Sequence, residues 1–151
     1  MVDVVLGTAT DFTDSWFEVQ FAYVPFNIKD NHWVLLRFEL AECELTYFDS
    51  LPEITPLEEF KKRLDPIATL LGRLLESVGY YGETRQLKEP WNIVKASQIP
   101  IQHNNHDCGV FTIKYFEYLA TESSFDTFVQ SRVPYFRRQL AYQMWTNHAS
   151  Y

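Results

Sequence analysis

The sequence predicts an α+β fold in which the strands come first and most helices follow. Segments rich in β-branched and aromatic residues gather between about residues 18 and 48. Apolar residues at three- and four-residue steps, the pattern of amphipathic helices, occupy much of the remaining chain. No repeat, low-complexity tract or Gly/Ser linker divides the 151 residues. We therefore expect one domain over residues 1–151.

Four strands are expected. The first covers residues 18–24 and ends at Pro25, while residues 33–40 and 44–48 form two further strands joined by a short connection. These two are expected to pair as a hairpin, and a short fourth strand is expected at 91–95.

Three helices are expected between and after the strands. Residues 57–78 carry apolar side chains at helical spacing, and Pro66 is expected to kink or divide this helix before Gly79 stops it. A second helix is expected from about 108 to 120 and a final one from about 134 to 148.

The composition limits the partners that the protein can have. Thirteen Lys and Arg against 20 Asp and Glu give a net charge of −7, which disfavours nucleic acid and acidic membrane surfaces. No apolar run approaches the roughly 20 residues of a membrane span, and the start lacks the order of a signal peptide. The two cysteines, Cys43 and Cys108, form no Cys-x-x-Cys pair, so free thiols in the nucleus or cytoplasm are expected.

The hairpin brings a histidine to an aspartate. If Val34 faces Tyr47, one face of the hairpin is apolar, and the same register sets His32 opposite Asp49 at its open end. A carboxylate on one ring nitrogen fixes the tautomer and stabilises the imidazolium, as in a catalytic triad. Two alternatives stay open: a plain surface pair, and a slip of register by two residues, because residues 39–42 lack Asn-Gly turn chemistry.

A cysteine at the start of the second helix is a candidate nucleophile. Asp107 is a natural side-chain N-cap, which places Cys108 at the first helical position, where the helix dipole favours a thiolate. Gly109 leaves the backbone beside the sulfur open, and the Cys108 amide and the Gln102 side chain could hold an oxyanion. The alternative for Cys108 is a small buried residue of a core helix.

Other polar residues have simpler interpretations. Cys43 lies on the apolar face of the hairpin, opposite Phe38, and is expected to pack in the core. His103 and His106 are expected to be loop residues, although either could replace His32 as the base. No metal is expected, because the Cys-x-x-Cys and His-x₃-His spacings of zinc sites are absent, and no cofactor is expected either.

These residues resemble a known family. His32-Trp33, the segment Tyr47-Phe48-Asp49-Ser50-Leu51, and Gln102 followed after five residues by Cys108-Gly109-Val110-Phe111 are similar to the catalytic domain of the ubiquitin-like-protein-specific proteases. This is the SUMO protease family of Ulp/SENP type, related to the adenovirus protease, and the resemblance is strongest over residues 23–144. It implies a papain-like, adenain-like fold with a mixed sheet flanked by helices.

The resemblance also implies roles for the residues that match. His32 would be the base, Asp49 its orienting partner, Cys108 the nucleophile and Gln102 an oxyanion donor. Trp33 would close over the Gly-Gly tail of a modifier in a narrow tunnel, where a β-carbon would clash; its alternative is a large strand residue covering the sheet.

The resulting hypothesis is a cysteine endopeptidase or isopeptidase. It would cleave a ubiquitin-like modifier such as SUMO after Gly-Gly, from a precursor or from a target lysine, with no nucleic acid or membrane as partner. The family's upstream Trp-Leu-Asn-Asp-like segment is missing, so we expect an N-terminally truncated domain of uncertain activity on its own. Two alternatives are a catalytically silent module that binds a modifier or another protein, and a thiol acyltransferase.

Overall fold

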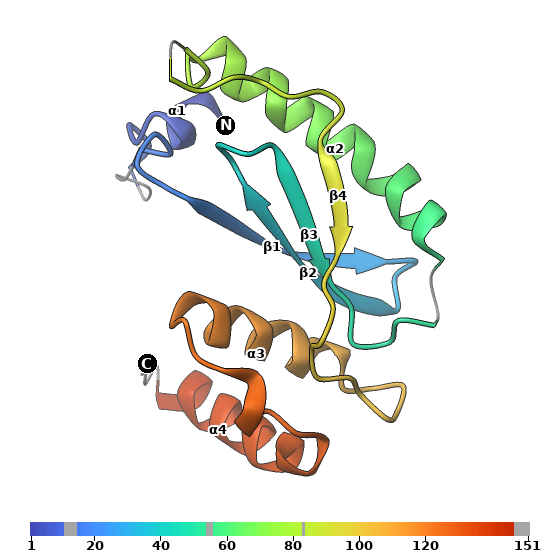
Figure 1. Ribbon diagram of the computed structural model, residues 1–151. Helices are drawn as coiled ribbons and strands as arrows, with labels where there is room; N and C mark the ends of the chain where they lie inside the picture. Colours follow the sequence, from blue (N-terminus) through green and yellow to red (C-terminus); the bar gives the residue numbers. More distant parts are fainter. Residues whose placement is uncertain (11–14, 54–55, 83, 147–151) are drawn as a thin grey trace. The chain divides into compact units, whose positions relative to one another are not determined.

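The computed structural model describes residues 1–10, 15–53, 56–82 and 84–146 (Figure 1). Four strands are hydrogen-bonded in the order β1-β2-β3-β4. The strands are β1 (Phe21–Ile28), β2 (His32–Glu39), β3 (Glu44–Phe48) and β4 (Asn92–Lys95). The helices are α1 (Val2–Val5), α2 (Leu57–Ser77), α3 (Cys108–Ala120) and α4 (Val133–Thr146), with the 3₁₀ turns η1 (Phe125–Thr127) and η2 (Gln130–Arg132) before α4.

The sheet is mixed, and the fold is α+β as predicted. β4 pairs in parallel with β3, with Glu44 opposite Asn92. β2 and β3 are neighbours joined by only four residues, which is the connection of an antiparallel hairpin. In the described ranges no helix is long and apolar enough to cross a membrane.

The chain divides into two compact units. The first unit comprises Met1–Val24, Leu36–Tyr47 and Thr55–Lys95, and the second comprises Pro25–Leu35, Phe48–Ile54 and Ala96–Tyr151. Each unit is therefore assembled from three separate stretches of sequence.

In the first unit, α2 packs beside β4 (Figure 1). Phe60, Leu64 and Ala68 are among the buried residues that recur at four-residue steps along α2. The expected division at Pro66 is wrong: the helix runs unbroken from Leu57 to Ser77. Pro66 lies on the exposed side, and burial of the opposite face on both sides of it outweighs the lost hydrogen bond.

The connection of the hairpin differs from the one expected. Leu40–Cys43 form the turn, and Cys43 has a φ of 55°, so it ends the turn instead of facing Phe38 in a strand. The expected burial of Cys43 is confirmed, because only 1% of it is exposed. Its sulfur accepts the Lys88 amide at 3.3 Å and donates to the Tyr81 hydroxyl at 3.4 Å.

The first strand is displaced from its predicted range. It begins at Phe21 and continues through Pro25 to Ile28, because β1 is an edge strand, where a proline without an N–H costs no ladder hydrogen bond. The single-turn α1 was not expected, since four residues are too few to show a helical period.

In the second unit, α3 and α4 lie side by side (Figure 1). Phe111 and Tyr115 of α3 meet Phe128, which in turn meets Phe136 of α4 edge-on with ring centroids 5.6 Å apart. α3 has the predicted bounds, and α4 begins one residue earlier than predicted; the predicted end of α4 at residue 148 lies outside the described residues.

Candidate active site

His32 and Asp49 form a buried hydrogen-bonded pair. His32 opens β2 and Asp49 directly follows β3, and they are 3% and 1% exposed. His32 Nε2 lies 2.7 Å from Asp49 Oδ1. The same carboxylate oxygen accepts the Leu51 amide at 2.8 Å, so the carboxylate itself is held in place. The expected meeting of these two side chains is present, and their burial rules out a surface pair.

The pKa of His32 reflects its two neighbours. Burial lowers the pKa of the imidazole, but hydrogen bonding and negative charge from Asp49 and from Cys108 together raise it above its ordinary value of 6.5. Asp49 engages Nε2, and Nδ1 is buried without a hydrogen-bond partner among the described residues. The imidazole is thus hydrogen-bonded to a carboxylate, and the Cys108 thiol is near enough to affect its pKa, which makes these three residues a candidate Cys-His-Asp site.

Cys108 is the first residue of α3 and is 7% exposed. The Phe111 amide donates to the Asp107 carbonyl at 3.0 Å, which closes the first turn of the helix. Cys108 therefore lies at the positive end of the helix dipole, as predicted. A Cβ built on Gly109 meets nothing within 4 Å, so the space next to this residue, which directly follows Cys108, is open.

The expected side-chain cap by Asp107 is wrong. Asp107 occupies the N-cap position, but its φ of −99° and ψ of −2° are helical, and its carboxylate makes no cap hydrogen bond. The carboxylate instead accepts hydrogen bonds from Asn104 at 2.6 Å, Gln130 at 2.9 Å and the Arg137 guanidinium, whose Nε lies 3.0 Å away. Burial raises the pKa of Asp107, and these donors more than offset it, so the pKa is lowered.

Gln102 is held at both ends of its amide. The Ser50 hydroxyl donates to Gln102 Oε1 at 2.7 Å, and Gln102 Nε2 donates to the Asn104 carbonyl at 2.5 Å. The Gln102 backbone amide also donates to the Ser50 carbonyl at 3.0 Å. Gln102 is 4% exposed. The sequence assigns a role to Gln102 but none to Ser50, Asn104 or Gln130. These three residues only hold other side chains in place, and no sequence pattern marks such contacts.

The remaining predicted residues lie on the surface of the second unit. Trp33 follows His32 in β2 and is 42% exposed. His103 and His106 are exposed, and their backbone amides donate to Gln130 and Asn104. Neither takes the place of His32 beside Asp49. In the described part of the chain, no three His, Cys, Asp or Glu side chains are grouped as a metal site.

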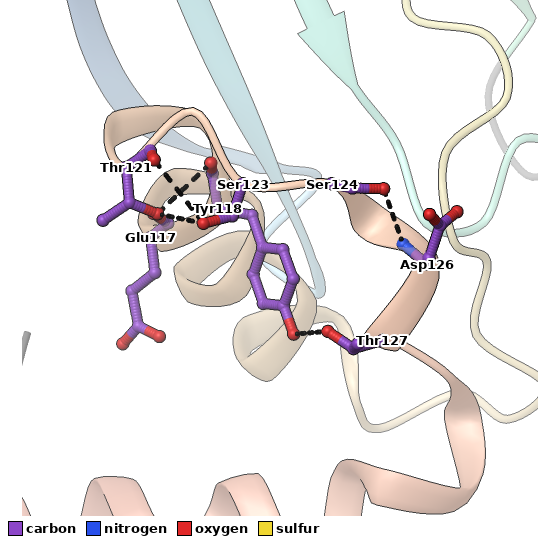
Figure 2. A pocket seen from close by; sticks show the side chains of 7 residues that line it. All are labelled: Glu117, Tyr118, Thr121, Ser123, Ser124, Asp126 and Thr127. Carbon is purple, nitrogen blue, oxygen red and sulfur yellow. Dashed lines mark hydrogen bonds between the residues drawn. The ribbon is translucent and has the colours of Figure 1, made fainter.

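A pocket of about 500 Å³ lies at the other end of α3 (Figure 2). Its walls carry Glu117, Asp126 and several hydroxyls that pair with one another, such as Tyr118 with Thr127 at 2.8 Å. It holds no thiol or imidazole. Cys108 and Ala120, the first and last residues of α3, are twelve helical steps or about 18 Å apart, so this pocket is distinct from the candidate active site.

Comparison with known proteins agrees with this geometry. Residues 5–149 match the model of the family described as "Ulp1 protease family, C-terminal catalytic domain". Human Sentrin-specific protease 2 is 28% identical over 131 residues, covering 85% of this chain and 20% of that protein. The Arabidopsis thaliana Ubiquitin-like-specific protease ESD4 is 27% identical over 123 residues, covering 79% of this chain and 22% of that protein.

Solved structures show the same fold. The C-terminal Ulp1 protease domain in complex with Smt3, the yeast ortholog of SUMO, superposes with a TM-score of 0.68 at 20% identity, over 94% of this chain and 59% of that one. The Chaetomium thermophilum Ulp1-like SUMO protease catalytic domain gives 0.60 at 23% identity, over 83% and 45%. The chain spans about a fifth of the length of the curated relatives it matches.

Proposed function

The chain belongs to the Ulp1 protease family, and on this premise we propose that it is a cysteine protease that cleaves a ubiquitin-like modifier after its C-terminal Gly-Gly. SUMO is the modifier proposed, because a structurally similar Ulp1 domain was solved with Smt3, the yeast ortholog of SUMO. The products would be the mature modifier from its precursor, or the free modifier and a lysine from a conjugate.

The hydrogen bond between His32 and Asp49, with Cys108 acting on the same imidazole, carries this proposal. In the proposed reaction, the Cys108 thiolate attacks the carbonyl carbon of the second glycine. The carbon–nitrogen bond then breaks, and the His32 imidazolium gives its proton to the leaving amine, which leaves a thioester. His32 next takes a proton from water, the hydroxide attacks the thioester, and the thiolate departs. Asp49 keeps the ring oriented throughout.

The proposed oxyanion site uses two donors. The Cys108 backbone amide and the Gln102 side-chain nitrogen would bind the oxygen that becomes negative in the tetrahedral intermediate. The open space beside Gly109 supports access of the substrate carbonyl. The half-exposed Trp33 would cover the glycine tail, since a larger residue there would meet the indole.

We also propose that residues 1–151 carry one such catalytic domain and that it works in the nucleus or cytoplasm. The two cysteines are both free thiols, which supports a reducing compartment. The formal net charge of −7 supports a protein partner over nucleic acid.

The proposal is tested by covalent labelling. SUMO bearing an electrophilic group in place of its terminal carboxylate is expected to form one adduct with the protein, and peptide mass spectrometry is expected to locate it at Cys108. Cys108→Ala is expected to abolish the adduct. Cys43→Ser is the matched control, because Cys43 is buried in the other unit, and it is expected to label normally.

Several outcomes would count against the proposal. Labelling that persists in Cys108→Ala or moves to Cys43 would refute the assigned nucleophile. Labelling by an equivalent ubiquitin probe but not by the SUMO probe would refute SUMO as the modifier. Capture of SUMO without an adduct or hydrolysis would support the binding-module alternative.

A further inference from the structure

The side-chain amide of Gln102 has two unlike ends, and only one of them suits an oxyanion. The Nε2 end donates hydrogen bonds, while the Oε1 end only accepts them and would repel a developing negative charge. A glutamine in this role therefore needs its amide fixed in one orientation before the reaction begins. Whatever fixes that orientation contributes to catalysis without touching the substrate.

Two contacts fix the amide. The Asn104 carbonyl can only accept, so it takes one N–H of Nε2 and determines which end of the amide faces it. The Ser50 hydroxyl donates to Oε1 at 2.7 Å and holds the opposite end. Nε2 carries a second N–H, and no hydrogen bond between described residues uses it. That N–H is the one available to an oxyanion.

The position of Ser50 ties it to the rest of the site. Ser50 directly follows Asp49, which orients His32, and both residues are 1% exposed. The Ser50 carbonyl also accepts the Gln102 backbone amide at 3.0 Å, so the two residues are joined through main chain and side chain. Two consecutive residues after β3 therefore hold the two groups: Asp49 orients the His32 imidazole, and Ser50 holds the Gln102 amide.

We infer that Ser50 is a positioning residue that orients the Gln102 amide as an oxyanion donor; this rests on the proposed protease function. Preorganised donors stabilise the transition state because they need no rearrangement when charge develops. Loss of the Ser50 hydroxyl leaves Oε1 unpaired and the amide held by the Asn104 carbonyl alone, so its orientation is less tightly fixed. The expected consequence is a lower kcat with an unchanged KM, because the ground-state carbonyl depends little on the donor.

A double-mutant cycle tests this inference. With a SUMO C-terminal fluorogenic amide as substrate, Ser50→Ala is expected to lower kcat about 10-fold, less than the roughly 10²–10³-fold of removing an oxyanion donor. In the Gln102→Ala background, Ser50→Ala is expected to change kcat by less than about twofold, because its target is gone. Alkylation of Cys108 by iodoacetamide forms no oxyanion and is expected to keep its rate in Ser50→Ala.

Thr112→Val is the matched control. Its hydroxyl is buried in α3 without a hydrogen-bond partner among the described residues, so its removal is expected to leave kcat unchanged. Equal losses from Ser50→Ala in both backgrounds, or a slower alkylation of Cys108, would overturn the inference and indicate a general structural role for Ser50.

A second measurement separates this inference from the proposed function. The side-chain amide protons of Gln102, identified in NMR spectra by their loss in Gln102→Ala, are expected to exchange slowly in the wild type and faster in Ser50→Ala. If the wild type does not cleave SUMO but shows this difference, the proposed function fails and the positioning by Ser50 stands. If these protons exchange equally fast in both proteins, the positioning is refuted whether or not SUMO is cleaved.

Discussion

The imidazole of His32 is buried beside the Asp49 carboxylate and the Cys108 sulfur. Burial alone would favour the neutral ring, yet both neighbours favour the imidazolium, and they prevail because one of them lies at hydrogen-bond distance. An imidazolium that persists toward neutral pH is what a thiolate nucleophile needs as its counter-ion and what a leaving amine needs as its proton donor. A single charge state thus serves two steps of the proposed reaction.

The pH dependence of His32 follows with a definite sign. Its pKa in the folded protein lies above the unfolded value of about 6.5. Protonated His32 therefore contributes stability that is fully present below pH 6.5 and is lost as the pH rises through the raised pKa. In an NMR titration, we expect the His32 ring protons to shift with a midpoint above 6.5, and Asp49→Asn to lower that midpoint.

Unfolding by urea provides a second check of the same prediction. The difference in free energy of unfolding between the wild type and His32→Gln is expected to shrink as the pH rises through the raised pKa. His103→Gln is the control, because that histidine is exposed on the loop. A midpoint below 6.5 in the wild type would show that burial outweighs the two neighbours and would contradict the prediction.

Two glycines in helices have opposite surroundings. In α2, a Cβ on Gly72 would lie 2.8 Å from Trp91 Nε1 and 3.1 Å from a Leu87 methyl, so the glycine allows the indole to approach the helix. In α3, a Cβ on Gly109 would meet nothing within 4 Å. The same substitution by alanine therefore tests packing in one helix and access to the sulfur in the other.

Gly72→Ala is expected to lower the free energy of unfolding by about 1–3 kcal/mol, because overpacking outweighs the helical preference of alanine. Gly109→Ala is expected to raise it by up to about 1 kcal/mol, yet to lower kcat/KM, since the methyl group occupies the space proposed for the substrate. Urea unfolding measures the free energies of unfolding, and turnover of a SUMO substrate measures kcat/KM. An unstable Gly109→Ala, or one with full activity, would contradict the proposed access route.

The elements differ in how far the sequence predicts them. β3 and α3 appear with their predicted bounds because each is a run of one hydrophobic period between clear polar breaks. β1 is displaced because a proline ends a strand only where the ladder needs a backbone N–H at that position. Whether it does depends on which strand lies at the edge, and that is a property of the whole sheet. The His32–Asp49 contact is predictable because hairpin pairing is local, and burial of the apolar face places both side chains on that face at the open end of the hairpin.

The hydrogen bonds that support the candidate site cannot be predicted from the sequence. Ser50 and Gln102 are 52 residues apart, and Asp107 and Arg137 are 30 apart. No periodicity links such pairs, and hydrogen bonds between them depend on how strands and helices pack. The side-chain cap expected of Asp107 is absent for this reason, because Asn104, Gln130 and Arg137 already occupy its carboxylate.

Across the second unit, one network joins the loop before the nucleophile to the C-terminal helix. Arg137 of α4 donates to the Asp107 carboxylate and, at 2.7 Å, to the His106 carbonyl. Asp107 also binds Asn104, whose carbonyl holds Gln102. α4 therefore braces the loop that carries Gln102 and leads into Cys108, although it contributes no residue to the proposed chemistry.

Arg137→Gln is expected to destabilise the protein by about 1–2 kcal/mol at pH 7. This is less than the 3–5 kcal/mol of breaking a fully buried pair, because the Arg137 side chain is 47% exposed.

The same substitution is expected to change the pH dependence of stability. Because the folded pKa of Asp107 is lowered, its contribution is present above the unfolded value of about 3.9 and is lost as the pH falls through the folded pKa. Without Arg137, burial is less opposed, the pKa of Asp107 rises, and acid destabilisation is expected to begin at a higher pH. Urea unfolding between pH 3 and 7 measures this shift. Arg138→Gln, at the neighbouring exposed arginine, is the control; an equal effect of both substitutions would show that the network does not brace the loop.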